Sequence, residues 1–237
     1  RHAASLGAGI SHVTGGSRGQ RPTIRGNTIA NNSRAILGGG IFFDRYSEPT
    51  IRNNLIRGNS APRANGGGVF LHFGTRSVVM NNIFHGNTAP IGAGLFLSNP
   101  KSSPSARATI ENNVVTGNSG AGIGNPANVH VKGCIFFGNT GVPMDGGSAQ
   151  YAWGSGRSGT GNLEPTAAPD DTPQFVDFPN DFHLAVGSLA IDAGRPGDAF
   201  NDPDDTQNDM GAFGGPGAAD GVGALGNIGV QGSIGPQ

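Results

Sequence analysis

Cysteine, lysine and long apolar runs are scarce in this 237-residue chain, and each shortage limits what the protein can be. Cys134 is the single cysteine, which excludes an internal disulfide and a cysteine-based metal centre. No apolar run approaches the roughly 18 residues that a membrane-spanning helix needs, so we expect no membrane span. The chain starts at Arg1 without a signal peptide, which predicts a mature or trimmed product, or a fragment.

Glycine and proline are abundant instead, with 43 and 16 residues. Such a share without any period would indicate a disordered chain. Here the glycines recur at a regular spacing, so we interpret them as the turns of a repeat.

Charge is sparse and unevenly divided along the chain. Residues 1–150 contain 13 Lys and Arg against 4 Asp and Glu, a balance of +9, whereas residues 151–237 contain 2 against 12, a balance of −10. This asymmetry indicates either surfaces that bind oppositely charged partners or two solvated surfaces of opposite sign. The basic residues are scattered over the repeats without a recognised motif, so we expect no nucleic-acid partner.

Two short motifs alternate along the first 150 residues. The first motif ends in asparagine, and these final asparagines are spaced by 27, 28, 31 and 21 residues. Its copies are Thr23–Asn32, Thr50–Asn59, Val78–Asn87, Thr109–Asn118 and His130–Asn139. The second motif is glycine-rich, with copies at Gly7–Ile10, Gly38–Ile41, Gly66–Val69, Gly92–Leu95 and Gly120–Ile123.

Each repeat contains short runs of β-branched and aliphatic residues between Gly and Asn, as strands do. A solenoid with about 20–30 residues per coil is either a leucine-rich repeat or a β-helix, and these units lack the leucines. We therefore predict an all-β fold, a right-handed parallel β-helix of about five to seven coils. Alternate residues of each strand point inward, so Ile51, Val79 and Ile110 are expected in one inward column.

Asparagine side chains are expected to stack in two ladders along the axis of this helix. A side-chain amide both donates and accepts, so asparagines one strand spacing apart can bond to one another. We interpret them as structural residues. The first ladder is Asn27, Asn54, Asn82 and Asn113, continued by Cys134, and the second is Asn32, Asn59, Asn87, Asn118 and Asn139.

The pairing of Gly66–Val69 with Phe84–Asn87, and of Gly120–Ile123 with Phe136–Asn139, resembles the repeats of polymorphic outer-membrane adhesins. More broadly, the NNxIxxN coils over residues 7–141 resemble the pectate-lyase-like β-helix superfamily. That superfamily contains lyases, hydrolases, adhesins and structural proteins, so the resemblance implies the fold and leaves the activity open.

A second resemblance lies in Pro173–Gly194, followed by Asp209–Gly215. These residues are similar to the segment that closes many bacterial secreted β-helix proteins, where it adds a last coil and covers the open end of the core. An uncovered end exposes unpaired backbone groups. We expect coils in residues 1–150, a Gly/Ser/Pro-rich loop or linker in 151–172, a closing coil with an acidic loop in 173–217, and a Gly-rich tail in 218–237.

Candidates for catalysis are few. Lyases of this superfamily use a carboxylate cluster with calcium, and its hydrolases use paired aspartates. The coils hold only Asp44, Glu48, Glu111 and Asp145. Glu111 has Met80 and Lys132 at the matching positions of adjacent coils, so no carboxylate pair forms on its face. Asp44 and His72 occupy equivalent positions on neighbouring coils, either as a surface polar pair or as a proton-transfer pair that lacks a third group.

An acidic loop is the candidate metal site. Asp202, Asp204, Asp205 and Asp209 follow Asp198 within twelve residues, and oxygen ligands at short spacing on a flexible loop suit Ca²⁺. The alternative is a solvated loop whose Asp and Asn side chains bond their own backbone.

Two apolar stripes are expected to face outward, and outward apolar stripes need a cover. One consists of Phe42, Phe70 and Phe96, and the other of Leu55, Ile83, Val114 and Ile135. The cover is the chain's own loops, its tail Gly221–Gly235, a neighbouring subunit, or sugar rings stacked on the aromatic residues.

Two functions remain open from the sequence. The first is a non-catalytic structural or adhesive protein, extracellular or on the cell surface, which assembles head to tail through its basic coils and acidic C-terminal part. The second is a polysaccharide-binding or polysaccharide-degrading protein, in which the strand face with Arg25, Arg52 and Lys132 holds an acidic polysaccharide.

Overall fold

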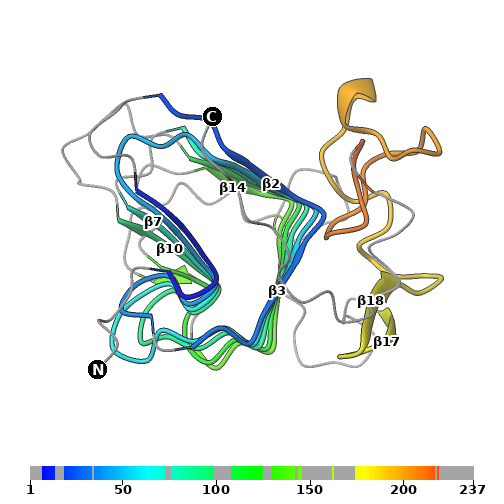
Figure 1. Ribbon diagram of the computed structural model, residues 1–237. Coiled ribbons are helices and arrows are strands. Elements are labelled where there is room, and N and C mark those ends of the chain that lie inside the picture. The colour runs from blue at the N-terminus through cyan, green and yellow to red at the C-terminus, as the bar shows by residue number, and fades with distance from the viewer. Residues whose placement is uncertain are drawn as a thin grey trace.

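The computed structural model of the chain describes residues 7–13, 19–33, 35–72, 76–98, 108–124, 130–141, 144–145, 162, 174–216 and 218. Within these ranges, every strand before residue 146 belongs to one of three parallel sheets, which form the walls of a solenoid (Figure 1). Among the residues described, none lies in a helix long and apolar enough to cross a membrane.

Each coil contributes one strand to each sheet, so neighbours in a sheet come from successive repeats. The first sheet contains β1 (Ile10–His12), β4 (Ile41–Phe43), β7 (Val69–His72), β10 (Leu95–Ser98), β13 (Ile123–Gly124) and β16 (Met144–Asp145). The second contains β2 (Thr23–Arg25), β5 (Thr50–Arg52), β8 (Val78–Met80), β11 (Thr109–Glu111) and β14 (His130–Lys132). The third contains β3 (Thr28–Ala30), β6 (Leu55–Arg57), β9 (Ile83–His85), β12 (Val114–Thr116) and β15 (Ile135–Phe137).

The residues that pair between neighbouring strands are those that the ungapped alignment of the repeats places at equivalent positions. Ile51 pairs with Val79 across β5 and β8, and Val79 pairs with Ile110 across β8 and β11. The parallel β-helix predicted from the sequence is therefore confirmed as the fold class.

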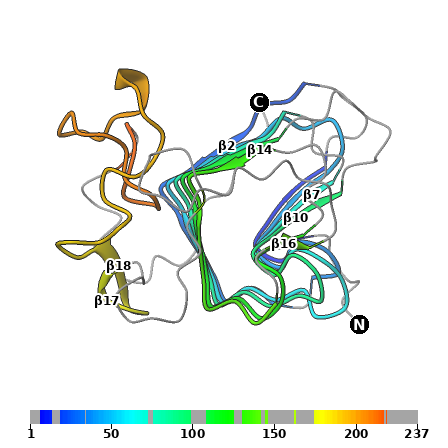
Figure 2. The same ribbon diagram turned by 180° about the vertical axis from the view of Figure 1, so that it is seen from behind.

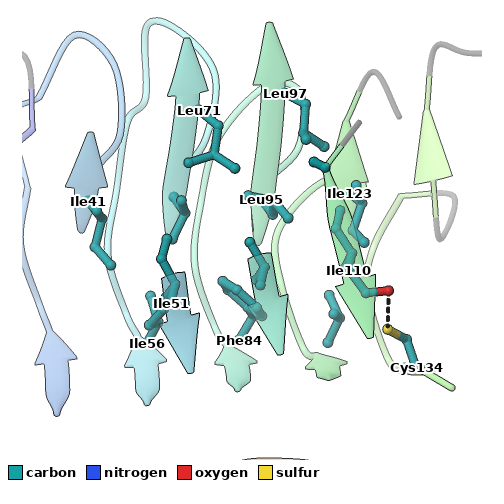
Figure 3. Close-up of a cluster of buried hydrophobic side chains, with 14 of the residues drawn as sticks. Ile41, Ile51, Ile56, Leu71, Phe84, Leu95, Leu97, Ile110, Ile123 and Cys134 are labelled. Carbon is teal, nitrogen blue, oxygen red and sulfur yellow. Dashed lines mark hydrogen bonds between the residues drawn. The ribbon is translucent and has the colours of Figure 1, made fainter. Parts of the chain in front are cut away.

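The hydrophobic core fills the space that the three sheets enclose (Figure 3). Inward side chains of all three sheets meet there, and Ile51, Ile56 and Leu95 are fully buried. Identical or similar side chains stack along the axis, because parallel neighbours repeat at a strand spacing of about 4.8 Å. Fully burying one Ile or Leu side chain contributes about 1.5–3 kcal/mol, so the stacked columns supply the main stabilisation of the coils.

The asparagines that were expected to stack form two hydrogen-bonded columns at the corners of the coils. In the first, Nδ2 of Asn54 donates to Oδ1 of Asn82 at 3.0 Å, and Nδ2 of Asn82 donates to Oδ1 of Asn113 at 3.0 Å. In the second, Nδ2 of Asn59 donates to Oδ1 of Asn87 at 3.1 Å. The remaining links are Asn27 to Asn54, Asn32 to Asn59, Asn87 to Asn118 and Asn118 to Asn139.

The first ladder continues beyond Cys134 into the segment that we expected to be a linker. The backbone N–H of Cys134 donates to Oδ1 of Asn162 at 3.0 Å, and Nδ2 of Asn162 donates to the carbonyl of Val131 at 3.1 Å. Asn162 is the one residue described between 151 and 172, and it adds a rung to the ladder. The expected Gly-rich tail lies outside the described residues, apart from Ala218.

Residues 174–216 form what we call the C-terminal segment. We expected this segment to cover the end of the stack of coils, and the structure places it elsewhere. Its strands β17 (Phe175–Asp177) and β18 (Asp181–Leu184) form a separate antiparallel hairpin, followed by the 3-10 turn η2 (Asp198–Phe200). Both views place this segment beside the coils, along the third sheet (Figures 1 and 2). The physical reason is the apolar outer stripe of that sheet, which the segment covers.

Candidate functional site

The C-terminal segment buries the outward stripe of the third sheet. Leu55, Ile83, Val114 and Ile135 are each at most 2% exposed and form one hydrophobic cluster with the segment. The segment contributes Phe182, Ala190, Met210 and Ala212, with Phe175, Leu184, Ala193 and Phe213 packed around them. Of the covers considered from the sequence, the chain's own loops are the ones that the structure shows on this stripe, and they belong to the C-terminal segment.

Three asparagines at the turn between the second and third sheets hold the segment in place, and we call Asn53, Asn81 and Asn112 the docking asparagines. Each has a left-handed backbone, with φ of 52°, 51° and 55°. Asn tolerates this conformation better than other residues with a Cβ atom. Each precedes a ladder asparagine, and all three are buried beneath the segment.

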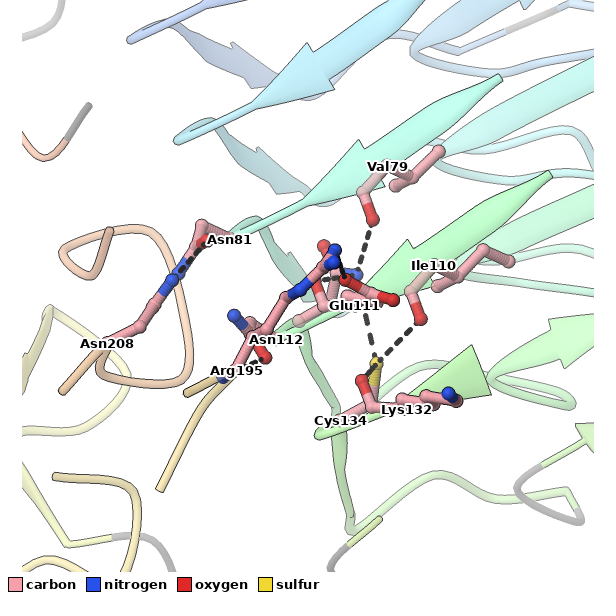
Figure 4. Close-up of polar contacts among 10 residues, drawn as sticks. Val79, Asn81, Ile110, Glu111, Asn112, Lys132, Cys134, Arg195 and Asn208 are labelled. Atoms are coloured by element: carbon pink, nitrogen blue, oxygen red, sulfur yellow. Dashed lines mark hydrogen bonds and ion pairs between the residues drawn. The ribbon is translucent and has the colours of Figure 1, made fainter. Parts of the chain in front are cut away.

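The docking asparagines bond mainly to backbone groups of the segment. Nδ2 of Asn53 donates to the carbonyls of Ala212 and Gly214 at 3.0 and 2.8 Å. Nδ2 of Asn81 lies within 3.1 Å of Oδ1 of Asn208 and of two carbonyl oxygens, those of Asp209 and Gly211 (Figure 4). These contacts fix the segment to the turns of successive coils.

Asn112 and Glu111 anchor the same segment at Arg195 (Figure 4). The backbone N–H of Arg195 donates to Oδ1 of Asn112 at 3.0 Å, and its guanidinium lies 2.8 Å from a carboxylate oxygen of Glu111. The guanidinium also lies 3.8 Å from the ring centroid of Phe200. Glu111 is 8% exposed and faces Met80 and Lys132 on the adjacent strands, so it is an anchoring residue without a carboxylate neighbour on its face.

Sequence reasoning missed the docking asparagines, although the sequence carries a signal for them. The residue before the ladder position is Asn in the three central repeats and Gly in the two flanking ones, at Gly26 and Gly133. If the left-handed backbone were the only requirement at this position, glycine would satisfy it in every repeat. A switch from Gly to Asn in the central coils therefore indicates that the side chain has a partner there.

The acidic loop bonds its own backbone, as the alternative to the calcium site supposed. Oδ2 of Asp202 accepts from the Asp209 N–H at 3.0 Å, Oδ1 of Asp209 accepts from the Asp192 N–H at 2.8 Å, and Asp204 accepts from Thr206. Asp205 lies in the same turn with a φ of 67°. Among the described residues, no three His, Cys, Asp or Glu side chains come together as metal ligands. Calcium binding by Asp202, Asp204, Asp205 and Asp209 stays a prediction.

Burial and mutual repulsion perturb two of these aspartates. Burial raises the pKa of Asp209 to about 6, and the charges of Asp202, Asp192 and Asp204 add to the rise. Burial also raises the pKa of Asp202, against hydrogen bonds from the backbone of Gly215 and Asp209. The C-terminal segment therefore contains a carboxyl group whose pKa is raised to about 6.

The aromatic stripe does not form the exposed platform that we expected for sugar rings. Phe42, Phe70 and Phe96 do point away from the main core, but they are 1%, 3% and 9% exposed and cluster with Leu37. Ring centroids lie 5.7 Å apart between Phe42 and Phe70 and 5.2 Å apart between Phe70 and Phe96. The three rings and Leu37 pack against one another, so the stripe is a buried cluster and not an exposed surface.

Asp44 and His72 make the contact that their equivalent positions predicted. Nδ1 of His72 lies 2.9 Å from Oδ1 of Asp44, beside the rings of Phe42 and Phe70. Burial raises the pKa of Asp44, but hydrogen bonds from His72 and from the Arg45 backbone outweigh it and hold that pKa below its usual value.

Two polar columns occupy outward-pointing positions of the second and third sheets beside the C-terminal segment, and Thr116 in the third sheet is buried. In the second sheet, Arg25 pairs in register with Arg52, and Lys132 lies exposed further along the same column. In the third sheet, Arg57, His85 and Thr116 pair in register on β6, β9 and β12. The second-sheet column also contains Met80 and Glu111 between Arg52 and Lys132, whereas Arg57, His85 and Thr116 in the third sheet all carry hydrogen-bond donors.

Three of the four coil carboxylates have side chains that the structure describes, and each of the three contacts a basic side chain; the side chain of Asp145 lies outside the described part. Glu111 pairs with Arg195, Asp44 with His72, and Glu48 with Arg21 at 2.9 Å. An inverting or retaining glycosidase needs two carboxyl groups on opposite sides of one bond, and these three side chains lie in separate pairs.

Comparison with known proteins gives one positive result. No curated protein and no solved structure matches the sequence. Residues 5–158, well over half of the chain, match the family described as the right-handed β-helix region. The chain therefore belongs to the right-handed β-helix family.

Proposed function

We propose that the protein is a non-catalytic extracellular scaffold with a structural or adhesive role. The observation that carries this proposal is that Asp44, Glu48 and Glu111 each contact a different partner side chain, His72, Arg21 and Arg195 respectively. Backbone ladders and asparagine ladders tie the coils together without a disulfide, which suits a rigid support outside the cell.

The test of the non-catalytic role is an assay on polygalacturonate and alginate with calcium, following ultraviolet absorbance of unsaturated products and release of reducing ends. We expect no product above a heat-inactivated control. Product release that is lost in Glu111→Gln but kept in Arg195→Gln would contradict the proposal. The two variants break the same ion pair, and only the first removes the carboxylate.

The distribution of charge supports head-to-tail assembly of such a scaffold. Asp198, Asp204 and Asp205 are exposed on the acidic loop, whereas Arg21 and Arg25 are exposed on the coils. A contact between unlike surfaces of two copies does not close on itself and can grow into a filament. Complementary charge orients such a contact.

Sedimentation velocity over a range of protein concentrations, with negative-stain electron microscopy, tests the assembly. We expect large species at low salt that dissociate at high salt, because screening weakens contacts between exposed charges. Replacing both Asp204 and Asp205 by Asn should reduce assembly, whereas Asp177→Asn, at an exposed position on β17, should not. A monomer at all concentrations in low salt would contradict head-to-tail growth.

Binding of an acidic polysaccharide is the second candidate, and the register of Arg25 with Arg52 favours it. Successive cations along one column match a polymer that carries repeated negative charges. Affinity electrophoresis in polygalacturonate should show retardation that falls in a variant with Arg25→Gln and Arg52→Gln. The variant Arg63→Gln, at an exposed loop position, is the matched control, and equal retardation of all three proteins would contradict this candidate.

A further inference from the structure

Arg57, His85 and Thr116 lie side by side on three neighbouring coils, at the third position of β6, β9 and β12. In each residue one buried polar atom has no hydrogen-bond partner: Nε of Arg57, Nδ1 of His85 and Oγ1 of Thr116. These are three of the six such side-chain atoms in the described part of the chain, and all three fall in one column. An unpaired buried polar group costs about 1–3 kcal/mol, so the presence of three such groups in one column needs an explanation.

The chemistry of the three groups defines what would satisfy them. The Nε–H of Arg57 can only donate, and the imidazole of His85 and the hydroxyl of Thr116 can donate as well. Within the described residues Arg57 takes part in no ion pair, so its charge is not neutralised there. A ligand that fits this column offers several acceptor oxygens and a negative charge, which is the pattern of a carboxylate.

The surroundings of His85 are partly buried and aromatic. Burial lowers the pKa of His85 and the Arg57 charge lowers it further, against an interaction with the Thr116 backbone that raises it. Asp181 on β18, which precedes Phe182 in the sequence, is bonded to His183, with Oδ1 2.6 Å from Nδ1. The rings of Phe178 and Phe182 each lie 5.1 Å from the His85 ring, centroid to centroid, and Phe178 is 42% exposed.

We propose that Arg57, His85 and Thr116 bind a carboxylate group at the junction between the third sheet and the C-terminal segment, with the exposed ring of Phe178 beside the rest of the ligand. The site is independent of head-to-tail assembly and of the Arg25–Arg52 column, which lies in another sheet. It joins side chains of three coils to an aromatic ring of the C-terminal segment, so a bound carboxylate holds the two parts together.

Titrations of the full chain with acetate, with glucuronate and with glucose, followed by the NMR signals of the His85 ring, test this site. We expect saturable shifts with both carboxylates and none with glucose, and a titration of His85 displaced to higher pH when the site is filled. Arg57→Gln and Thr116→Val should each weaken binding about tenfold or more, as the loss of a hydrogen bond to a charged group implies. Arg25→Gln should bind as the unchanged protein does.

The two carboxylates distinguish the source of the ligand. Equal affinity for acetate and glucuronate means that a free carboxylate is sufficient, whereas tighter binding of glucuronate that disappears in Phe178→Ala means that the site takes a sugar acid. Either result supports the carboxylate site. If neither compound saturates the His85 signal, or if Arg57→Gln and Thr116→Val both fold and titrate unchanged, the proposal fails and ordered water alone satisfies these donors.

Discussion

The amide nitrogen of Asn81 donates to Oδ1 of Asn208 at 2.8 Å, joining a turn of the central coils to a loop that lies 127 residues further along the chain. The same nitrogen lies within 3.1 Å of the carbonyls of Asp209 and Gly211. A single side chain thus gathers three acceptors of the C-terminal segment, and the segment depends on the coil geometry for its position.

Replacing Asn81 by Gly tests this dependence, because glycine keeps the left-handed turn and removes the side-chain hydrogen bonds. We expect a loss of about 1–3 kcal/mol in the free energy of unfolding, since acceptors of the segment remain buried without their donor. Urea denaturation measures the loss, and hydrogen exchange at the Gly211 amide measures opening of the segment. Asn31→Gly is the matched control, because Asn31 has a φ of 57° and is exposed. Equal effects of the two substitutions would count against docking through Asn81.

Asp209 should make the protein less stable as pH rises through about 6. Its pKa is raised to about 6 by burial and by neighbouring carboxylates. The folded state therefore holds the proton more tightly than the unfolded state, and the stability gained from protonation is present below about pH 4 and lost through about pH 6.

Asp209→Asn isolates the effect of this charge on stability, because it removes the ionisable group while the amide oxygen can still accept from the Asp192 N–H. We expect the variant to be more stable than the unchanged protein at pH 7 and equally stable near pH 4. The lowered pKa values of Asp44 and Asp181 act in the opposite direction, but they are common to both proteins and drop out of the difference. Thermal unfolding from pH 4 to pH 8 gives the comparison, and a constant difference over this range would contradict it.

Phe70→Ala should destabilise the coils by about 3–5 kcal/mol, the usual cost of truncating a buried Phe. Phe70 is 3% exposed and its ring stacks between those of Phe42 and Phe96. Urea denaturation measures the loss, with Val176→Ala as a control, because Val176 is an exposed apolar residue. If the Phe70→Ala protein kept its stability but was no longer retarded in polygalacturonate, the result would support the hypothesis that these rings stack on sugars, against the evidence of their burial.

The coils could be predicted from the sequence to the level of individual pairs, such as Ile51 with Val79, because a solenoid turns sequence period directly into strand register. The position of the C-terminal segment could not. Arg195 contacts Glu111 across 84 residues without any repeat relating the two. The burial of Phe42 and Phe70 was also missed, since alternation predicts only that a side chain points outward. Whether its neighbours then cover it depends on ring packing.

Cys134 stands in a ladder of asparagines, and Cys134→Asn should therefore stabilise the protein. Nδ2 of Asn113 lies 3.8 Å from Sγ of Cys134, a weak substitute for the amide oxygen that the other rungs supply at 3.0 Å. An asparagine here would accept from Asn113 and donate to the carbonyls of Ile110 and Lys132, which the thiol approaches at 3.8 and 3.4 Å. We expect a gain of about 0.5–1.5 kcal/mol, the net worth of one added hydrogen bond.

Cys134→Val is the control for this substitution, because valine fills the site and can neither donate nor accept. It should be less stable than the Asn variant in urea denaturation. The same position gives a chemical check on the native protein, since burial raises the pKa of the Cys134 thiol to about 12. A thiol reagent at pH 8 should therefore label Cys134 only after unfolding, because the thiolate is the reactive form. Rapid labelling of the folded protein, or a Val variant as stable as the Asn variant, would show that the ladder ends before this rung.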